Sequence, residues 1–552
     1  MSLPDFQPQA QLFSWAALSG QLFGADDRFR LFAEKIYPQL VSARDQLAAC
    51  YCTDNGRPAV EPVLLMGVTL LQFLENVPDR PAVEQLRYHA GWAFALNRPL
   101  GEGAFHPTVL VHFRDRLVEH QQAHLAFATI LEALQQVGLV ARQSQQRLDS
   151  MFVIGRLARM NSLECVRETM RLALEELGRT AARFAKPAAW SQWRERYFEH
   201  KLDYRNGEET LRAKLQQAGE DLLALQQWVS RLSDSSIAQG ENVRLLTRVL
   251  AEHFELVEGS GLSPRRAPVP GALQNPHEPD AQWAAKGQGR HRQEVVGYKI
   301  QVAETVPDAP RQKGEPTAAF LTAVETQPAI GSDDAGFEQV EAAQAQRGQP
   351  PASAWHVDGA YVSAERLARM KAQGRQLIGP AQPAPKKDAR YCTEDFDVSV
   401  AQRRAVCPAG KPNTQCSRLE EYKTGKVCYR FEWSTHCHDC PSRRNCLGKD
   451  QRHRTLVVGE HYDLLQARRR EQKTEAFAEQ KKKRNAIEGT QSELVRGYGA
   501  RRARYRGYAK VRLQNYFIGG ACNAKRWIRR LQWQMKQDLA TGSGAVAVVP
   551  SG

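Results

Sequence analysis

Short apolar stretches alternate with helical segments between residues 295 and 379, and this alternation constrains the fold of the chain more than any other feature. Strands are predicted over 295–304, 318–325, 353–361 and 376–379, and helices over 334–346 and 364–373. The first two strands are spaced as a hairpin across a Pro-containing connection. Alternation of this kind predicts an α/β fold, a mixed sheet flanked by helices.

The chain is too long for one hydrophobic core, because domains commonly hold about 100–200 residues and this chain has 552. Apolar residues at steps of three and four predict helices through most of the first 145 residues, and again from residue 162 to about residue 256. Pro-rich residues 259–280 predict an ordered loop or linker. We expect an N-terminal all-helical domain over 1–145, which serves DNA binding and dimerisation or is a structural cap. A catalytic domain is expected over 146–390 and 447–535, with a helical insertion over 160–258 and a small Cys-rich insertion over 391–446. A flexible tail is expected over 536–552.

Two of the predicted strands carry an aspartate. Asp149 lies within the apolar segment Leu148–Val153, and Asp358 lies near the end of Trp355–Tyr361. A carboxylate in a buried strand costs several kcal/mol unless it is paired or binds a metal, so each needs a reason. Metal binding is one reason, and for Asp358, which precedes a glycine, a turn or capping role is another.

Positive charge is concentrated near the C-terminus. The window Lys481–Arg530 holds fifteen Lys and Arg residues but two acids, Glu488 and Glu493, in a chain of net charge +15. Such a field suits a polyanion such as DNA, although charge runs are commonly solvated faces or disordered tails. We expect the aromatic residues of this window to form a folded surface that contacts bases or sugars: Tyr498, Tyr505, Tyr508, Tyr516, Phe517 and Trp527.

The order of several motifs resembles bacterial insertion-sequence transposases of the DDE superfamily, in the branch with an N-terminal helical domain and a cysteine-containing insertion. The motifs are Leu148-Asp149-Ser150, Asn161-Ser-Leu-Glu, Pro279-Asp-Ala, Gly297-Tyr-Lys, Glu304-Thr305, Val357-Asp358-Gly-Ala-Tyr361, Gly379-Pro380, Ile487-Glu488-Gly-Thr and Arg504-Tyr-Arg-Gly-Tyr-Ala-Lys510, with Gln514 and Asn523. The resemblance covers about residues 10–535. It implies an RNase H-like fold, with the first Asp on strand one, the second after strand four and the Glu on a following helix.

The resemblance implies that Asp149, Asp358 and Glu488 are the catalytic acids, with Glu493 as the substitute for Glu488. Relatives show a Tyr, Arg, Glu, Lys signature around the last acid. This chain keeps Arg484 and Glu488 but has Lys481 in place of Tyr and Val495 in place of Lys, with Arg496 adjacent. The expected DNA-contacting residues are Arg484, Arg496, Arg501, Arg502, Arg504, Arg506 and Lys510.

Three carboxylates suit hard divalent cations, so two Mg²⁺ ions, or Mn²⁺ in their place, are the expected cofactors. The expected reaction is hydrolysis at the ends of a mobile element, followed by attack of the freed 3′-hydroxyl on target DNA. The expected partners are double-stranded DNA, both element ends and target, and a second copy of the chain. An RNase H-like nuclease without strand transfer and a non-catalytic domesticated DNA-binding protein are the alternatives.

Seven of the eleven cysteines fall between Cys392 and Cys446. Their spacing favours a structural Zn²⁺ over disulfides, and the alternative is reduced thiols without a metal. The expected zinc ligands are Cys407, Cys437, Cys440 and Cys446, with Cys416 and Cys428 as substitutes.

The N-terminal residues show no secretory signal and the longest apolar stretch is too short for a membrane span, so we expect a cytoplasmic, nucleoid-associated protein.

Overall fold

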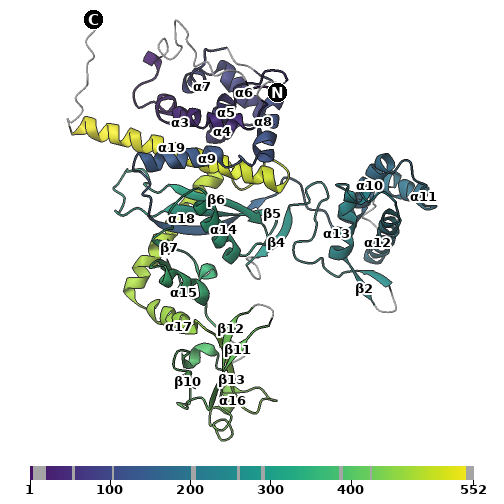
Figure 1. The fold of residues 1–552 in the computed structure, drawn as a ribbon, viewed down its shortest axis with the longest axis vertical. Coiled ribbons are helices and arrows are strands. Elements are labelled where there is room, and N and C mark those ends of the chain that lie inside the picture. Colours follow the sequence, from purple (N-terminus) through teal and green to yellow (C-terminus); the bar gives the residue numbers. More distant parts are fainter. Residues whose placement is uncertain are drawn as a thin grey trace.

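The computed structural model describes residues 1–3, 20–52, 56–101, 105–200, 207–257, 261–287, 292–384, 390–422 and 425–541. A mixed sheet with helices lies at the centre, with a helical N-terminal region on one side of it (Figure 1). A group of helices projects to the side, and a small β-rich region lies at the end away from the N-terminal helices (Figure 1). The expected mixed sheet flanked by helices is therefore confirmed.

Within the described residues, the regular elements of the N-terminal region are all helical, as expected. Its longest helix, α5, is buried over nearly its whole length, because Val63, Leu64, Leu70 and their neighbours are apolar on every face. The helical elements are η1 (Gly20–Leu22), α2 (Arg28–Leu31), η2 (Phe32–Ile36), α3 (Tyr37–Ser42), α4 (Arg44–Ala48), α5 (Pro62–Leu74), α6 (Asp79–Tyr88), α7 (Ala90–Ala95), α8 (Thr108–Glu119) and α9 (Leu125–Gln136).

The central sheet has the order β4-β5-β1-β7-β8, with β6 also paired to β5. Strand β1 pairs antiparallel with β5 and parallel with β7, and β7 pairs parallel with β8. The first 3-10 helix after β7 is η6 (Gly359–Tyr361). The strands are β1 (Gln145–Ile154), β4 (Gln282–Lys286), β5 (Gln293–Thr305), β6 (Leu321–Pro328), β7 (Ala354–His356) and β8 (Gln376–Ile378), and the helices among them are α14 (Asp333–Gln346) and α15 (Ala364–Ala372).

The hairpin of β5 and β6 was expected, but β4 was not. Strand β4 pairs with the first residues of β5, so β5 is longer than its apolar pattern suggested. The segment Gln282–Lys286 follows a Pro-rich stretch and lacks a run of β-branched residues, so only its pairing with β5 defines it as a strand.

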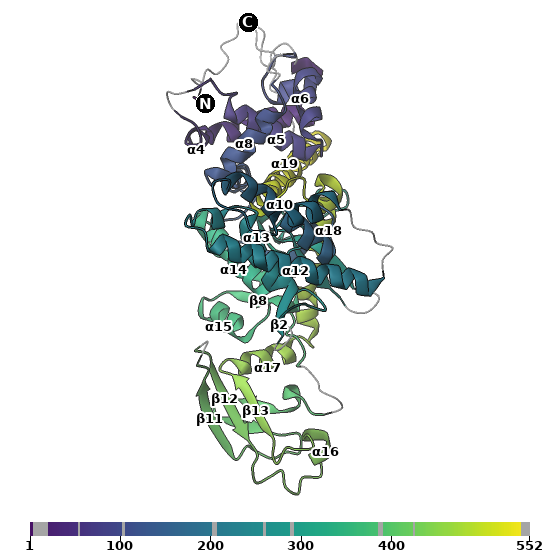
Figure 2. The ribbon, with the colours of Figure 1, turned by 90° about the vertical axis from the view of Figure 1, so that its right-hand side faces the viewer.

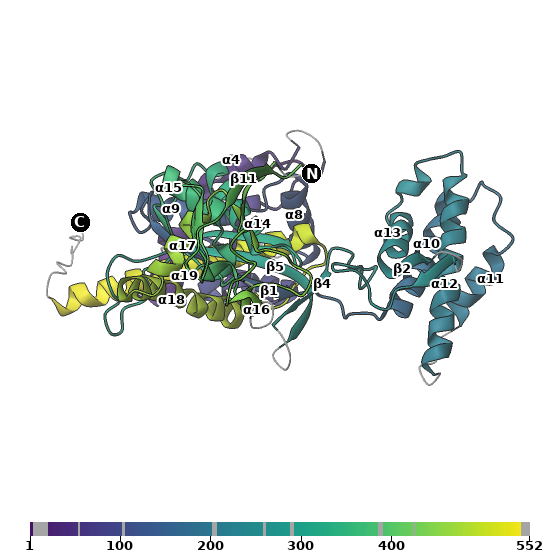
Figure 3. The ribbon, with the colours of Figure 1, turned by 90° about the horizontal axis from the view of Figure 1, so that it is seen from below.

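The helical insertion follows β1 and has its own hydrophobic core. Helix α10 begins with a capping box, in which Asn161 accepts from the Glu164 amide and the Glu164 carboxylate accepts from the Asn161 amide. The helices are α10 (Ser162–Thr180), α11 (Trp190–Arg194), η3 (Glu195–Glu199), α12 (Glu208–Ser230), η4 (Ile237–Gln239) and α13 (Val243–His253). The insertion stands apart from the sheet in a second view (Figure 3).

A short hairpin closes the insertion where a loop was expected. Strands β2 (Phe254–Val257) and β3 (Gly261–Pro264) pair antiparallel, and Phe254 is buried against Gly219 of α12. Packing of this aromatic ring draws the chain out of the helical path at residue 254. The helix therefore ends at His253, earlier than the periodicity suggested, and pairing of the strands extends to Pro264.

The Cys-rich region is a small β-domain. Its elements are η7 (Thr393–Asp395), β9 (Asp397–Ser399), β10 (Arg404–Val406), β11 (Gln415–Glu420), β12 (Val427–Glu432), α16 (Arg443–Cys446) and β13 (Thr455–Gly459). Strands β11, β12 and β13 form one sheet, so this unit continues past residue 446 to Gly459. Figure 2 shows it at one end of an elongated molecule.

Three helices complete the chain: α17 (Tyr462–Glu471), α18 (Glu475–Tyr498) and α19 (Tyr508–Ala540). Helix α19 lies between the sheet and the N-terminal helices, and Phe517 on it stacks on Phe73 of α5 with ring centroids 5.8 Å apart. Residues 536–540 belong to α19 and not to the tail that was expected from residue 536, and residues 542–552 lie outside the described residues.

Candidate active site

The first candidate acid, Asp149, lies in the middle of β1, opposite Val302 of β5. Its side chain is largely buried, and one carboxylate oxygen accepts a hydrogen bond from the Ser150 amide at 2.8 Å. The other oxygen, Oδ2, faces α18, which packs across this face of the sheet. The expectation of an acid in a buried strand is therefore confirmed at Asp149.

The second acid, Asp358, lies just beyond the end of β7 rather than inside it. Its Oδ1 accepts from the Ala360 amide at 2.8 Å, so it caps the 3-10 turn η6. The expected strand over 353–361 is thus shorter, because the Asp-Gly pair starts a turn. The capping role does not occupy Oδ2, which faces α18.

The third acid, Glu488, lies on α18, four residues after Arg484, as expected. The helix buries Ile487, Thr490 and Leu494 at steps of three and four, which turns the side containing Arg484 toward the sheet edge. The Glu488 side chain itself is 68% exposed. Helix α18 begins at an N-cap, Thr474, and ends at Gly499, whose φ of 71° is the left-handed conformation common after a helix end.

The guanidinium group of Arg484 joins the three acids. Its Nη2 lies 2.7 Å from Asp149 Oδ2 and 4.0 Å from Asp358 Oδ2, and its Nη1 lies 3.7 Å from Glu488 Oε1. Carboxylates from a strand, a turn and a helix therefore meet around one cation. With three negative charges and one positive, this acid cluster (Asp149, Asp358, Glu488 and Arg484) carries a formal charge of −2.

Helix α18 is held against β1 on both sides of this cluster. Arg147, two residues before Asp149 and on the same face of the strand, donates from Nη1 to the Lys483 carbonyl at 3.0 Å. On the other side, Gln491 donates to the Ser150 carbonyl at 3.3 Å. These two contacts fix the height and rotation of α18 relative to Asp149.

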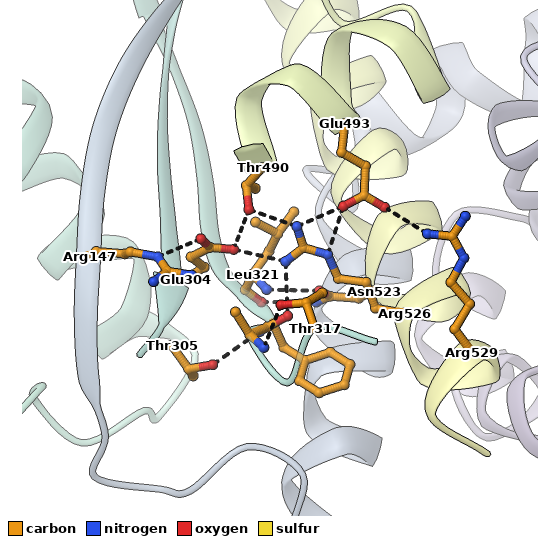
Figure 4. A network of polar contacts seen from close by, with 12 residues as sticks. Arg147, Glu304, Thr305, Thr317, Leu321, Thr490, Glu493, Asn523, Arg526 and Arg529 are labelled. Carbon is orange, nitrogen blue, oxygen red and sulfur yellow. Dashed lines mark hydrogen bonds and ion pairs between the residues drawn. The ribbon is translucent and has the colours of Figure 1, made fainter. Parts of the chain in front are cut away.

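A fully buried carboxylate, Glu304 of β5, anchors the same helix (Figure 4). It accepts from Arg147 at 2.6 Å, from Thr490 of α18 at 2.8 Å and from Arg526 of α19 at 2.8 Å. Burial alone would raise the pKa of Glu304, but Arg526 and Arg147 outweigh it, so the pKa lies below its ordinary value. This network, Arg147, Glu304, Thr490, Glu493 and Arg526, joins two strands to two helices.

The substitute acid, Glu493, belongs to this buried network and not to the acid cluster. Its Oε2 accepts from Arg526 Nη2 at 2.8 Å, and its Oε1 lies 3.8 Å from Arg529 (Figure 4). Glu488 is therefore the acid of α18 that faces Asp149 and Asp358, through Arg484.

Apart from Arg484, which lies in the acid cluster, the expected DNA-contacting residues fall into two groups. Arg496, Arg501, Arg502 and Arg506 are exposed. Arg504 instead donates to the Val77 carbonyl at 2.9 Å and packs over the ring of Phe73, and Lys510 pairs with Asp115 at 2.7 Å. These last two side chains link the C-terminal region to the N-terminal helices.

The aromatic residues of the basic window do not form the surface that we expected. Tyr498, Tyr516, Phe517 and Trp527 are buried in the core shared by α19, the sheet and the N-terminal helices, and Tyr505 and Tyr508 pack against that core. Aromatic rings on the inner faces of α18 and α19 stabilise the folded protein more when they are buried than when they are exposed to solvent. Part of the charge of the window is exposed on α18 and in the connecting loop, at Arg496, Arg501, Arg502 and Arg506, whereas Arg526 is buried.

Four cysteines from separate parts of the β-domain line one small pocket of about 20 Å³, room for about one water-sized group: Cys407, Cys437, Cys440 and Cys446. The pKa of the Cys446 thiol is raised, mainly by burial. Arg454 lowers this pKa in part, and the other three cysteines raise it further. The Cys437 sulfur accepts from the Arg454 amide at 3.4 Å. All eleven cysteines are free thiols.

Among the described residues, no three or more His, Cys, Asp or Glu side chains are close enough together to hold a metal ion as they stand. In the acid cluster, Arg484 occupies the space between the carboxylates. The donor chemistry nevertheless suits hard cations in the acid cluster and Zn²⁺ in the cysteine pocket.

Two family models match the chain. The model described as "Transposase DDE domain" matches residues 406–528, and the one described as "Transposase domain (DUF772)" matches residues 20–116. Comparisons with curated proteins and with solved structures found no match. Within the described ranges, none of the helices is long and apolar enough to cross a membrane.

Both matches are to domains of transposases, a class of nucleic-acid-modifying enzyme that binds DNA. They support an insertion-sequence transposase of the DDE type. The DDE match includes Glu488 and α18 but begins after Asp149 and Asp358, so those two acids are placed by the structure alone.

Glu304 was expected only as a motif residue, and no role was predicted for the Arg147 side chain. A signal for Arg147 was present, because a charged residue two positions before Asp149 in an apolar strand faces the same side of the sheet. No comparable signal linked Glu304 to Arg526, which is 222 residues further along the chain.

Proposed function

We propose that Asp149, Asp358 and Glu488 are the catalytic acids of a reaction that cuts DNA at the ends of a mobile element and joins the freed 3′-hydroxyl to target DNA. The observation that carries this proposal is the convergence of the three acids on Arg484. An enzyme that cuts without joining would use the same cluster, so a joining assay must separate the two. A non-catalytic DNA-binding protein would have no need for the cluster.

The charge of the cluster supports the binding of divalent cations. Its three negative charges are incompletely matched by the single positive charge of Arg484, which stands where cations would be held. Two Mg²⁺ ions, or Mn²⁺, held by the three acids would supply electrostatic stabilisation of the attacking and departing oxygens of the phosphodiester. Arg484, displaced from the centre, would donate to a phosphate oxygen.

The surrounding residues would keep the acids in position through each step. Arg147 and Gln491 fix α18 against β1, and the Ala360 amide fixes one oxygen of Asp358. Rigid placement of charged groups is the main means by which proteins catalyse phosphoryl transfer. Exposure of Glu488 leaves this side of the cluster open to a DNA strand.

The test uses purified protein, Mg²⁺ and labelled DNA that flanks its own gene. Asp149→Asn, Asp358→Asn and Glu488→Gln should each reduce cleavage about 10³-fold or more, since each is expected to remove several kcal/mol of stabilisation. Glu479→Gln, a change of the same type on an exposed part of α18, should leave it unchanged. Full cleavage by all three variants would show that the reaction occurs elsewhere.

We further propose that the protein acts on DNA as a homodimer bridged by the helical insertion. The insertion has its own core and stands apart from the sheet, so its outer helices are accessible to a second copy (Figure 3). Light scattering of the DNA complex should give the mass of two chains. Removal of residues 162–256 should leave a complex with one chain, and a one-chain complex of the intact protein would contradict the proposal.

We propose that the cysteine pocket binds a structural Zn²⁺. The four cysteines line one space of about 20 Å³, and binding would convert neutral thiols to thiolates. Protein purified without chelators should contain about one zinc per chain by mass spectrometry. The double variant Cys437→Ser/Cys440→Ser should lose it, and Cys52→Ser, at an exposed cysteine, should retain it. Zinc-free wild type that cannot be reloaded would contradict the proposal.

A further inference from the structure

A cleft of about 630 Å³ lies where the N-terminal helices meet the C-terminal region. One wall is formed by the start of α6 and by α8, and the other by the segment after β1 and the loop between α18 and α19. Five cations and two acids line it, which gives a formal excess of three positive charges: Arg80, Arg114, Arg156, Arg504 and Lys510, with Asp79 and Asp115.

The two acids of the cleft are already paired with cations. Arg114 donates to both oxygens of Asp79 at 3.0 and 2.6 Å, and Lys510 lies 2.7 Å from Asp115. Asp79 also accepts from Gln72 at 2.7 Å. These carboxylates therefore add little repulsion toward an incoming anion.

Two of the cations are exposed and differ from the rest. Within the part of the chain that the structure describes, no ion pair involves Arg80 or Arg156. Arg80 is in the first turn of α6, where the helix dipole also favours a negative charge. Arg156 donates to the Arg504 carbonyl, which orients it along the opposite wall.

The walls are held together by contacts across the domain boundary. Arg504 donates to Asn76 and Val77, and the Arg114 guanidinium packs over the Tyr505 ring at 4.6 Å. The cleft is thus already formed before any ligand binds, so little ordering would be required for binding.

The cleft lies close to the acid cluster along the chain. Arg156 follows Asp149 by seven residues, and β1 ends between them at Ile154, so the two residues are at most about 25 Å apart. Each DNA strand carries one phosphate per about 3.4 Å, so this limit corresponds to at most about seven base pairs. One duplex could contact both places.

We propose that this cleft binds the phosphate backbone of the DNA duplex within about seven base pairs of the bond to be cut, with Arg80 and Arg156 as the phosphate ligands. The proposal rests on the proposed function, because it takes the substrate to be duplex DNA. It assigns to the N-terminal domain a contact with the backbone, which orients DNA without reading its sequence.

The experiment measures the affinity for a fluorescein-labelled 40-base-pair duplex by anisotropy, in EDTA, across a series of salt concentrations. The double variant Arg80→Ala/Arg156→Ala should reduce the slope of log K against log salt by about two, and weaken binding about tenfold or more. Arg80→Lys/Arg156→Lys should largely restore both quantities. The control, Arg404→Ala/Arg444→Ala, removes two exposed charges from the β-domain at the far end of the molecule and should change neither.

Cleavage of the same duplex is measured separately in Mg²⁺. Unchanged affinity and salt slope in the Ala double variant would overturn the cleft proposal, and cleavage by wild type would still support the proposed function. A reduced slope in a protein that never cleaves would support the cleft and contradict the nuclease. An equal loss in the control pair would overturn the cleft proposal, because it would show a general charge effect.

Discussion

The acid cluster and the buried network use the same chemical groups and share two elements, β1 and α18, yet they are built for different purposes. In the buried network, Glu304 and Glu493 are matched by Arg147 and Arg526, and most contacts are 2.6–3.1 Å. In the acid cluster, three carboxylates share Arg484, at 2.7, 3.7 and 4.0 Å. The first set is electrically balanced, and the second is not.

This difference shows which group of charges is structural. A buried ion must be neutralised and hydrogen-bonded, because an uncompensated charge there would cost several kcal/mol. The cluster can carry its excess because Asp358 and Glu488 have side chains 38% and 68% exposed. Unmatched charge at an accessible edge is what a cationic ligand can use, so function is expected there.

The largest effect on stability should come from a substitution in the buried network. Arg526→Met removes one charge of a buried pair and leaves Glu304 with one arginine fewer, so the free energy of unfolding should fall by about 3–5 kcal/mol. Arg526→Lys, which keeps the charge but not the paired hydrogen bonds, should lose less. Urea unfolding measures both variants. A loss below about 1 kcal/mol in Arg526→Met would mean that the network is not structural.

A second prediction concerns the pH dependence of the stability that Glu304 contributes. The pKa of Glu304 is lowered in the folded state, so its contribution to stability is complete above its unfolded pKa of about 4.3 and is lost as pH falls through the folded pKa. Glu304→Gln should therefore destabilise by about 1.5–3 kcal/mol at pH 7, the value of hydrogen bonds to a charged group. Near pH 3 the two proteins should become more alike, because protonated Glu resembles Gln.

The measurement is the thermal midpoint of each protein between pH 3 and pH 7. Glu479→Gln provides the control, since that carboxylate is 70% exposed and should give a small, nearly constant difference. A gap between wild type and Glu304→Gln that stayed the same at every pH would show that Glu304 is not ionised in the folded protein.

Much of the cluster could be predicted from sequence, because local signals exist for it. An acid in an apolar strand marked Asp149, and the spacing of four residues placed Arg484 and Glu488 on one helical face. The central strands and their flanking helices followed from periodicity. The arrangement of all three acids around one guanidinium required their positions in space, since 335 residues separate Arg484 from Asp149.

The expectation for the aromatic residues was wrong because it, too, depended on how distant parts of the chain pack together. Sequence alone showed charges and rings together between Lys481 and Arg530, but not that α19 packs on both the sheet and the N-terminal helices. A helix covered on two sides buries its rings and even one arginine, Arg526. The pattern of Tyr516, Phe517 and Trp527 indicated burial as readily as it indicated contact with bases.

The smallest effect is predicted for a substitution in the acid cluster. Arg484→Gln removes the one cation among three acids, and charges about 4 Å apart interact by about 1 kcal/mol in water and several times more in a partly buried site. Because Arg484 competes for the same carboxylates, its loss should tighten the binding of Mn²⁺ to the DNA-free protein by roughly tenfold, or about 1.4 kcal/mol. Isothermal titration calorimetry measures this directly.

Arg496→Gln is the matched control, because it removes an exposed arginine from the same helix at a distance from the acids. It should change Mn²⁺ affinity little, since exposed charges separated by more than about 8–10 Å are screened at physiological salt. Weaker Mn²⁺ binding by Arg484→Gln would mean that the guanidinium assembles the acids instead of competing with the metal. The acid cluster would then resemble the buried network, and its negative charge would no longer argue for a cation site.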